Sequence, residues 1–510
     1  MAGSRYFQDR AALYYTERPL KKFPLPAASD KPVDADAGIS DNPRSAMSRP
    51  GTPESPLAVA IVGAGPSGFY AAEALLKALG PAVRVDLFDR LPTPFGLVRG
   101  GVAPDHQKIK SVTAVYEKTA ADPRVRFFGN VKLGRDLSVD DLRARYHQIV
   151  YAVGCESDRH MAIPGEDLAG SHSATEFVGW YNGHPDHRHR TFDLSCAAVA
   201  VVGVGNVAMD VTRLLACDPE ALAKTDVTGE AIDALRKSAV KTVWLLGRRG
   251  PAEAAYSEAE IEEIAELPTA DLVVEAAETA VDEVSQGELA DPAVKKKVAY
   301  VQAHAALGEG SRPRKVRLRF RVSPVEVVGE DGRVRALRVE KNALVADGKG
   351  GVKSVGTGQF ETLPVGLVLR SVGYRGIAIP GVPFDEKSGH IPNAAGRVLA
   401  APGGAPLPGE YVVGWAKRGP SGLIGTNRAD SVATVAAMLE DLKAGVPERA
   451  EDVSPDAATE LLAAKGLKPV LFADWKKLDA LERANGAKSG KIREKFTRVE
   501  DMLAALGPQG

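Results

Sequence analysis

Two stretches of the chain share one pattern: a short apolar run, a glycine-rich turn, and a segment with apolar residues at helical spacing. The first is LAVAIVG followed by AGPSGFYAAEALLKALG (57–80), and the second is AAVAVVG followed by VGNVAMDVTRLLA (197–216). A continuous apolar run is typical of a parallel strand that is buried on both faces. Each stretch is followed by a further apolar strand, VRVDLFD (83–89) or VKTVWLLG (240–247), so both predict a strand–helix–strand unit.

The first turn has the form G-x-G-x-x-G, with Gly63, Gly65 and Gly68 at the three small positions. Such glycines permit a tight turn, a close approach of a pyrophosphate and close packing of helix on strand. The phosphate would lie at the N-terminus of the helix. Asp89, about 26 residues beyond Gly63, ends the next strand and is placed to accept hydrogen bonds from ribose hydroxyls. We therefore predict a dinucleotide site here, the alternative being a plain glycine turn.

The second turn has Gly203, Gly205 and Ala208 at the small positions, but its next strand ends in Arg248 and Arg249 and not in an acid. Two guanidinium groups favour a ribose that carries a 2′-phosphate. Their distance from Gly205, about 43 residues, is long, and the extra stretch CDPEALAKTDVTGEAIDALRKSA (217–239) is expected to be helical. The pattern predicts NADP(H) here, unless the arginines are an ordinary solvated pair, and a different ligand, FAD, in the first unit.

Composition narrows the class of protein. Lys+Arg number 65 and Asp+Glu 66, so nothing indicates a nucleic acid partner, and no stretch approaches the ~18 apolar residues of a membrane span. The three cysteines, Cys155, Cys196 and Cys217, form no C-x-x-C pair. This excludes the usual patterns for a redox dithiol, a zinc site or an iron–sulfur cluster, so no metal site is expected and the cysteines are predicted to be free thiols.

Residues 1–55 are rich in Pro, Ser, Asp and Ala without periodicity, and are expected to form a disordered extension. They contain no apolar core of a secretory signal, and Asp9 and Glu17 lie in their most basic part, unlike a mitochondrial presequence. We therefore expect the bacterial cytoplasm as the compartment, with the mitochondrial matrix as the alternative.

Longer motifs are more specific than the glycine turns. The chain resembles the adrenodoxin reductase family, which includes mitochondrial adrenodoxin reductases and bacterial ferredoxin–NADP reductases, in register from about residue 57 to the C-terminus. The matching stretches are LPTPFGLVRGGVAPDHQKIK (91–110), GRRGPAEAAYS (247–257), RSVGYRGIAIPGVPFD (370–385) and GWAKRGPSGLIGTNRADS (414–431). The resemblance implies an α/β fold of two dinucleotide-binding, Rossmann-like domains, with the NADP domain inserted in a discontinuous FAD domain.

The expected division is an extension at 1–55, FAD domain at 56–155, NADP domain at 156–369, and FAD domain again at 370–510. The chain would cross between domains near IVYAVGCESDR (149–159) and LVLRSVGYR (367–375) as two adjacent strands. Alternating charged and apolar residues in 314–328 and 333–345 predict a half-exposed antiparallel sheet. Residues 450–510 are expected to be helical and peripheral.

The resemblance also implies roles for single residues. FAD would be contacted by Gly63, Gly65, Ser67, Gly68, Asp89, Leu97, Val131, Trp415, Gly422, Leu423 and Ile424. NADP(H) would be contacted by Gly205, Asn206, Val207, Arg248, Arg249, Glu260 and Gly422. His106 and Glu263 match a catalytic pair beside the nicotinamide, where they would position groups and tune protonation. Core packing of Trp415 and surface exposure of Glu263 are the alternatives.

The activity implied is that of a ferredoxin–NADP reductase, which moves hydride from NADPH to FAD and then single electrons to an iron–sulfur protein. Ferredoxins are acidic, so a basic docking face is expected, with Lys295–Lys297, Arg312, Arg314 and Lys315 as candidates or as ordinary surface charge. The alternatives are another NADPH-dependent flavoprotein, either a monooxygenase or an electron-transfer subunit, and a non-enzymatic, flavin-binding NADPH sensor.

Overall fold

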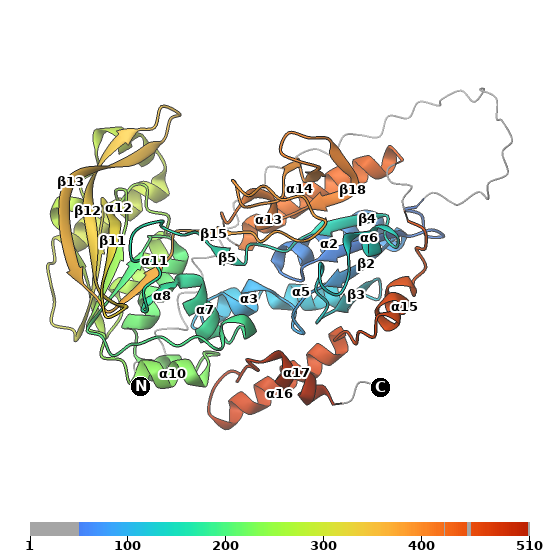
Figure 1. Cartoon of the computed structure of the whole chain (residues 1–510), viewed down its shortest axis with the longest axis horizontal. Helices are drawn as coiled ribbons and strands as arrows, with labels where there is room; N and C mark the ends of the chain where they lie inside the picture. The colour runs from blue at the N-terminus through green and yellow to red at the C-terminus, as the bar shows by residue number, and fades with distance from the viewer. Residues whose placement is uncertain (1–49, 423, 446–449, 508–510) are drawn as a thin grey trace.

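The computed structural model describes residues 50–422, 424–445 and 450–507. Most of the expected N-terminal extension and Leu423 lie outside these ranges. The described residues form a mixed α/β fold with two units side by side, each built on a largely parallel sheet (Figure 1).

The first unit is built on seven strands in the order β16-β17-β18-β4-β1-β2-β3. The parallel strands are β1 (Leu57–Val62), β2 (Val83–Phe88), β3 (Val125–Phe128), β4 (Gln148–Tyr151) and β18 (Pro406–Val412). An antiparallel edge follows, made of β16 (Asn393–Ala394) and β17 (Arg397–Leu399). All of β1 is buried, because α2 (Pro66–Leu79) and α14 (Ile424–Lys443) pack over one face and the 133–146 region over the other.

The second unit has six strands, all parallel, in the order β6-β14-β7-β8-β10-β9. They are β6 (Ser171–Ser173), β7 (Ala198–Val202), β8 (Thr242–Leu246), β9 (Ala270–Val274), β10 (Arg314–Arg319) and β14 (Leu367–Arg370). One face carries α7 (Ala174–Asn182), α8 (Asn206–Ala216), α11 (Glu258–Ala265) and α12 (Pro292–Ala305). The inserted stretch 217–239 contains α9 (Pro219–Leu222) and α10 (Gly229–Arg236), as its pattern predicted.

An antiparallel sheet covers the other face of the second unit. It consists of β11 (Val322–Glu330), β12 (Arg333–Ala346) and β13 (Val352–Pro364). The prediction of an antiparallel sheet is confirmed for 322–345 and wrong for 314–319, because β10 lies between β8 and β9 in the parallel sheet. The basic residues that alternate with apolar ones in β10 are paired within the fold. Arg314 donates to the Val240 carbonyl, Arg317 pairs with Glu309, and Arg319 pairs with Glu278.

Two short strands connect the units. β5 (Ser157–Asp158) pairs antiparallel with β15 (Tyr374–Arg375), so the two segments that cross between the sheets run next to each other (Figure 1). Strands of the first sheet thus come from both sides of the segment that builds the second sheet. The domain boundaries given above stay a prediction.

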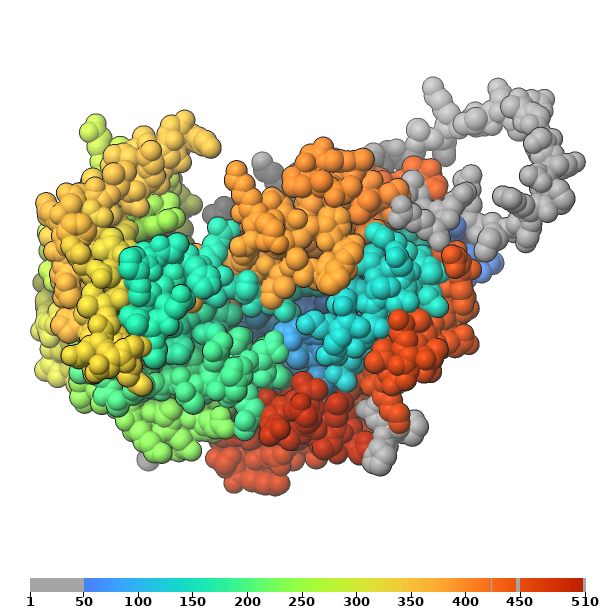
Figure 2. Space-filling model, in the orientation of Figure 1, coloured from blue at the N-terminus to red at the C-terminus, as the bar shows by residue number. Residues whose placement is uncertain are grey.

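Helices α15 (Ala457–Ala464), α16 (Phe472–Lys488) and α17 (Val499–Leu506) form the C-terminal segment. Its helical character was predicted, but its peripheral position is wrong: Glu482 and Lys495 are buried. Figure 2 shows this segment lying against both units. Arg99 of the first unit donates to Glu482 Oε2 at 2.8 Å, and Ile492 N donates to the carbonyl of Lys224 in the second unit at 3.3 Å.

A second buried contact is centred on Asp226, which lies between α9 and α10. Its carboxylate accepts from Lys110 Nζ of the first unit at 2.8 Å and from Lys495 Nζ of the C-terminal segment at 2.9 Å. Burial would raise the pKa of Asp226, but the two ammonium groups outweigh it and hold the pKa well below its usual range. Three segments that are far apart in sequence therefore share one buried ion cluster.

We expect Asp226→Asn to destabilise the protein by about 3–5 kcal/mol, because two buried ammonium groups lose their counter-ion. Denaturant unfolding followed by circular dichroism measures this change. The control is Asp233→Asn on α10, whose side chain is 67% exposed and whose replacement should stay within about 0.5 kcal/mol of the unmodified protein. Equal stabilities for the two variants would contradict the role given to Asp226.

Candidate functional site

The first glycine turn leaves no room for side chains. A Cβ on Gly63 would lie 2.4 Å from the Ala152 carbonyl oxygen, and one on Gly68 would lie 2.1 Å from the Gly63 oxygen. Helix α2 begins at Pro66 without a side-chain cap, so the first amides of the helix remain for a ligand. Gly96 faces the turn, and a Cβ there would lie 3.0 Å from Gly65 Cα. The result is a bare backbone cradle at a helix N-terminus, which suits a pyrophosphate.

Asp89 follows β2 and is fixed by the turn itself. Its Oδ2 accepts from Ala64 N and its Oδ1 from Leu91 N, both at 2.9 Å. Burial raises the pKa of Asp89 to about 6, although both amides lower it. Val131 N donates to the Asp89 carbonyl at 2.9 Å, so the predicted residues Asp89 and Val131 lie together. Each carboxylate oxygen accepts one backbone bond and has a second acceptor site that suits a ribose hydroxyl.

The stretch after β18 closes on the same turn. A Cβ on Gly414 would lie 2.1 Å from Ser67 Oγ, and Ser431 Oγ donates to the Ser67 carbonyl at 3.0 Å. Trp415 follows, with its ring centroid 5.2 Å from that of Tyr374. The indole Nε1 is buried and has no hydrogen-bond partner among the described residues. A side-chain-free cradle with an orphaned buried donor beside it fits a flat, polar ring system such as that of FAD.

Other residues predicted for this site fall around it. Leu97 is partly exposed and begins α3 (Leu97–Gly100), directly after Gly96. Gly422 is exposed with φ 80°, and Ile424 opens α14. Leu423 lies outside the described residues.

The second glycine turn repeats the first with more open space. A Cβ on Gly203 would lie 2.2 Å from the Ser371 oxygen, whereas one on Gly205 would have no atom within 4 Å. Helix α8 begins at Asn206, whose Oδ1 is buried and has no hydrogen-bond partner in the described part of the chain. Val207 packs on the core and Ala208 is fully buried. Helix α8 has no side-chain cap at its start, so its first amides, like those of α2, suit a pyrophosphate.

Arg248 and Arg249 follow β8, the second strand of this unit. Their carbonyl groups accept from Asn342 Nδ2 and Arg321 N, which fixes the backbone. Neither guanidinium has a side-chain or carbonyl partner among the described residues, whereas Arg317 on neighbouring β10 pairs with Glu309 at 2.6 Å. Two unpaired guanidinium groups at the end of this strand fit a phosphate on the ribose.

His106 and Glu263 meet across the two units. His106, just before α4 (Gln107–Lys110), has its Nε2 3.0 Å from Glu263 Oε2 on α11 and its Nδ1 3.6 Å from Asp210 Oδ1 on α8. Burial and Arg213 lower the pKa of His106, but Asp210, Glu263 and Asp105 outweigh them and raise it to about 9. Burial raises the pKa of Glu263, and the bonds to His106 and Arg213 bring it below the usual value. The pair is therefore an imidazolium against a carboxylate.

Sequence reasoning missed Arg213, which lies at the centre of this cluster. Its guanidinium is 3% exposed and bonds Asp105 through Nε at 2.7 Å and Nη2 at 2.9 Å. Nη2 also donates to Asp210 at 2.8 Å, and Nη1 lies 3.2 Å from Glu263 Oε2. Asp210 and Arg213 are three residues apart on the helix that follows the second glycine turn. This spacing, which allows an ion pair on one face of a helix, was the only sign in the sequence that Arg213 belongs to the site.

Glu260, predicted to contact the coenzyme, is buried on α11 with its Oε2 3.6 Å from Arg213 Nη1. Burial and the neighbouring Asp210 raise its pKa to about 8, so it is protonated at neutral pH. His106, Asp210 and Glu260 offer ligand atoms within 4.8 Å of one another, the separation of a metal site. The Arg213 guanidinium already supplies positive charge to these carboxylates, and we attribute the cluster to ion pairing.

The proposed basic docking residues are mostly occupied within the fold. Lys297 is buried and donates to the Ala254 carbonyl, Lys296 pairs with Glu258 at 2.8 Å, and Lys315 pairs with Asp271 at 2.6 Å. Arg312 and Arg314 donate to backbone carbonyl groups. Only Lys295, among these candidates, is exposed without such a contact in the described structure. A docking face at these residues stays a prediction, except for Lys297, whose side chain is buried.

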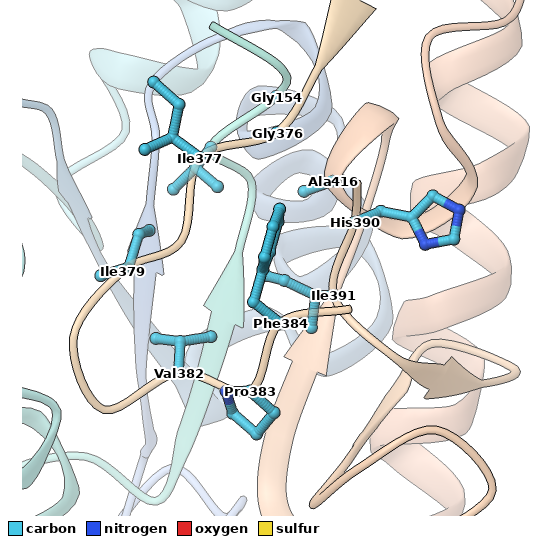
Figure 3. Close-up of a pocket in the computed structure, with 11 residues that line it drawn as sticks. Gly154, Gly376, Ile377, Ile379, Val382, Pro383, Phe384, His390, Ile391 and Ala416 are labelled. Atoms are coloured by element: carbon cyan, nitrogen blue, oxygen red, sulfur yellow. The ribbon is translucent and has the colours of Figure 1, made fainter. Parts of the chain in front are cut away.

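A shallow recess lies beside the crossing strands (Figure 3). Its walls are apolar and come mainly from Ile377, Ile379, Val382, Phe384 and Ile391, while the His390 ring points away from them. None of the residues predicted to bind a nucleotide lines it. The recess has no charged wall for a phosphate, so the candidate site is the region between the two turns.

Comparison with known proteins agrees with this geometry. The model of the pyridine nucleotide-disulphide oxidoreductase family matches residues 57–377. The chain is 44% identical over 461 residues to NADPH-ferredoxin reductase FprA of Mycobacterium tuberculosis, covering 88% of this chain and 98% of that protein. It is 42% identical over 459 residues to the human mitochondrial NADPH:adrenodoxin oxidoreductase, covering 88% and 92%.

A solved structure gives the same result. Mycobacterium tuberculosis FprA in complex with NADPH matches with a TM-score of 0.83 at 44% identity, over 88% of this chain and 99% of that one. The fold is therefore the mixed α/β fold of that protein, with two parallel Rossmann-like sheets. Among the described residues, no helix is long and apolar enough to cross a membrane.

We expect His106 to titrate near pH 9 in the folded protein. Since this lies above the unfolded value of about 6.5, its ion pairs stabilise the fold fully below pH 6.5 and cease to do so as pH rises through 9. Nuclear magnetic resonance of protein with 13C-labelled histidine measures the value, and Glu263→Gln should lower it. His147 is the internal control, because burial lowers its pKa to about 4 and its Nδ1 accepts from Ala58 N. A His106 pKa at or below 6.5 would contradict the assigned cluster.

Proposed function

The chain belongs to the adrenodoxin reductase family of pyridine nucleotide-disulphide oxidoreductases, and on that premise we propose that it is an NADPH–ferredoxin reductase. One observation supports this most strongly. Two unlike glycine turns lie in units that meet at the His106–Glu263 contact: one turn has an acid after its second strand, and the other has two arginines whose guanidinium groups have no partner among the described residues.

The first unit would hold FAD. Its backbone turn at Gly63–Gly68 would receive the pyrophosphate, Asp89 the ribose, and the region of Trp415 and Gly422 the flavin ring. FAD supplies the ability to take up two electrons together and to release them one at a time. The amides at the start of α14 would stabilise negative charge on the ring, since a helix N-terminus favours anions.

The second unit would bind NADPH and orient it. The uncapped start of α8 at Asn206 and the open space at Gly205 would receive the pyrophosphate, and Arg248 and Arg249 would bind the 2′-phosphate. Glu260 is protonated at neutral pH, so it can donate a hydrogen bond to the coenzyme. These residues would hold NADPH by its phosphates, at the side of the second unit that faces His106.

His106 and Glu263 would lie where the nicotinamide approaches the flavin ring. Hydride transfer needs no general acid, so the pair acts by position: His106 holds a proton on each ring nitrogen, and Glu263 fixes the ring and offers an acceptor for a carboxamide. His106 is 11% exposed and Glu263 is 31% exposed, so their contact would also limit the access of water between the two units.

An acidic one-electron carrier of the ferredoxin type is the partner that we propose. FprA and the human relative are named for ferredoxin and adrenodoxin reduction, respectively. The bacterial cytoplasm is the proposed compartment, with the mitochondrial matrix as the alternative.

Disulfide chemistry, which the wider family name suggests, does not suit this chain. Cys155, Cys196 and Cys217 are all free, and burial raises the pKa of Cys155 and of Cys217 to about 12. Thiols of this kind carry almost no thiolate at neutral pH and react poorly in exchange. The other flavoprotein activities and the sensor function are distinguished by experiment.

The activity test is anaerobic mixing of the flavin-loaded protein with NADPH, followed by addition of a ferredoxin. We expect the flavin absorbance to bleach and then to recover as ferredoxin is reduced, with little oxygen consumption in an aerobic control. Flavin that stays oxidised would support the sensor, and turnover that requires oxygen and an organic substrate would support a monooxygenase.

We expect Arg248→Ala plus Arg249→Ala to remove the preference for NADPH over NADH, because the 2′-phosphate loses both guanidinium partners. Loss of two charge-assisted contacts should raise the KM for NADPH by about 100-fold and leave that for NADH nearly unchanged. Steady-state kinetics with both coenzymes measures the ratio. Arg317→Ala is the matched control, since Arg317 pairs with Glu309 nearby. Selectivity that persists in the double variant would contradict the assignment.

A further inference from the structure

The most heavily paired side chain at the junction is Arg213. It is placed on α8, two turns beyond Asn206, the residue that opens this helix at the coenzyme turn. Its guanidinium contacts carboxylates from three separate segments: Asp105 before α4, Asp210 on its own helix, and Glu263 on α11. Arg213 thus touches the loop of the first unit, through Asp105, and carboxylates on both helices of the second unit.

Two atoms in this cluster are shared between Arg213 and His106. Glu263 Oε2 lies 3.0 Å from His106 Nε2 and 3.2 Å from Arg213 Nη1. Asp210 Oδ1 lies 3.6 Å from His106 Nδ1 and 2.8 Å from Arg213 Nη2. Each of these two carboxylates therefore contacts both the imidazole of His106 and the guanidinium of Arg213 through the same oxygen atom. Asp105, which precedes His106 in the chain, accepts two hydrogen bonds from Arg213, one on each carboxylate oxygen.

We propose that Arg213 is a positioning residue for hydride transfer, which fixes His106 of the first unit against Glu263 and Asp210 of the second. The inference rests on the proposed function and adds a residue to it. Through the bidentate bond to Asp105, Arg213 holds the loop that carries His106. Through Asp210 and Glu263 it sets the two acceptors between which the imidazole is oriented.

Charge balance gives the same assignment. Arg213 and protonated His106 oppose the carboxylates of Asp105, Asp210 and Glu263, while Glu260 stays protonated at neutral pH. Tyr181, the titratable group that α7 adds to this region, is kept neutral because burial raises its pKa well above the usual value. Without Arg213, three carboxylates would share one imidazolium, and one of them would take up a proton as pH falls toward neutrality.

The test compares Arg213→Met and Arg213→Lys by stopped-flow reduction with NADPH across pH. In Arg213→Met we expect hydride transfer to slow by about 10- to 100-fold, since a misplaced group beside the reacting atoms is costly, while flavin content stays the same. The rate should also fall on the acid side, where a cluster carboxylate now binds a proton. Arg213→Lys keeps a charge that reaches fewer carboxylates, so it should slow transfer without the acid-side fall.

Arg236→Met on α10 is the matched control, because Arg236 is exposed and pairs with Glu220 outside the cluster. It should leave rate and pH profile unchanged. If Arg213→Met keeps the rate and pH profile of the unmodified protein, the proposal is overturned. A uniform loss of coenzyme affinity with an unchanged hydride-transfer rate would also overturn it, because positioning acts on the rate of the chemical step.

Asp105→Asn is the second variant, and it carries the test if Arg213→Met fails to retain flavin. It removes one anion beside His106 and frees one side of Arg213, so the pKa of His106 should fall below its unmodified value of about 9 and its ring signals should broaden. This readout needs no coenzyme, so it is independent of the proposed activity. If NADPH does not reduce the unmodified protein, the proposed function is refuted. If the pKa and the ring signals of His106 are unchanged in Asp105→Asn, the positioning role of Arg213 is refuted.

Discussion

The structure depends on one constraint: two separate α/β units must keep a fixed relation while only short strands connect them. β5 and β15 supply two residues each, too little to hold the units by themselves. Two buried ion clusters set this relation. In one, Arg213 of the second unit binds Asp105 of the first, and in the other, Asp226 of the second unit binds Lys110 of the first and Lys495 of the C-terminal segment. Buried ion pairs of this kind give little net stability over an apolar contact, but they specify one geometry.

This choice of interaction suits the proposed reaction. An apolar interface would tolerate small slides of one unit over the other, whereas a bidentate guanidinium–carboxylate bond is lost when its partners shift by an ångström. Hydride transfer requires two rings to meet within a similar tolerance. Asn206 and Glu260, which would bind the coenzyme, lie on the same two helices, α8 and α11, as Asp210, Arg213 and Glu263, so binding and alignment are coupled.

Much of the fold followed from local pattern. Buried strands such as β1 and β7 are uniformly apolar, and the glycine turns fix the start of α2 and α8, so these elements were predictable. The pairing of charged side chains was not. Lys295–Lys297 and Lys315 read as a surface patch, yet Lys297 is buried and Lys315 pairs with Asp271. Lys495 and Arg213 find partners more than a hundred residues away, and such partners have no local signature.

The central claim is that FAD and NADPH meet at the junction beside His106 and Trp415. The most direct measurement is a crystal structure of the flavin-loaded protein with NADP+ bound. We expect the nicotinamide to contact the flavin ring at about 3–3.5 Å, with the 2′-phosphate on Arg248 and Arg249. A nicotinamide that lies away from the flavin, with the 2′-phosphate free of both arginines, would contradict the account.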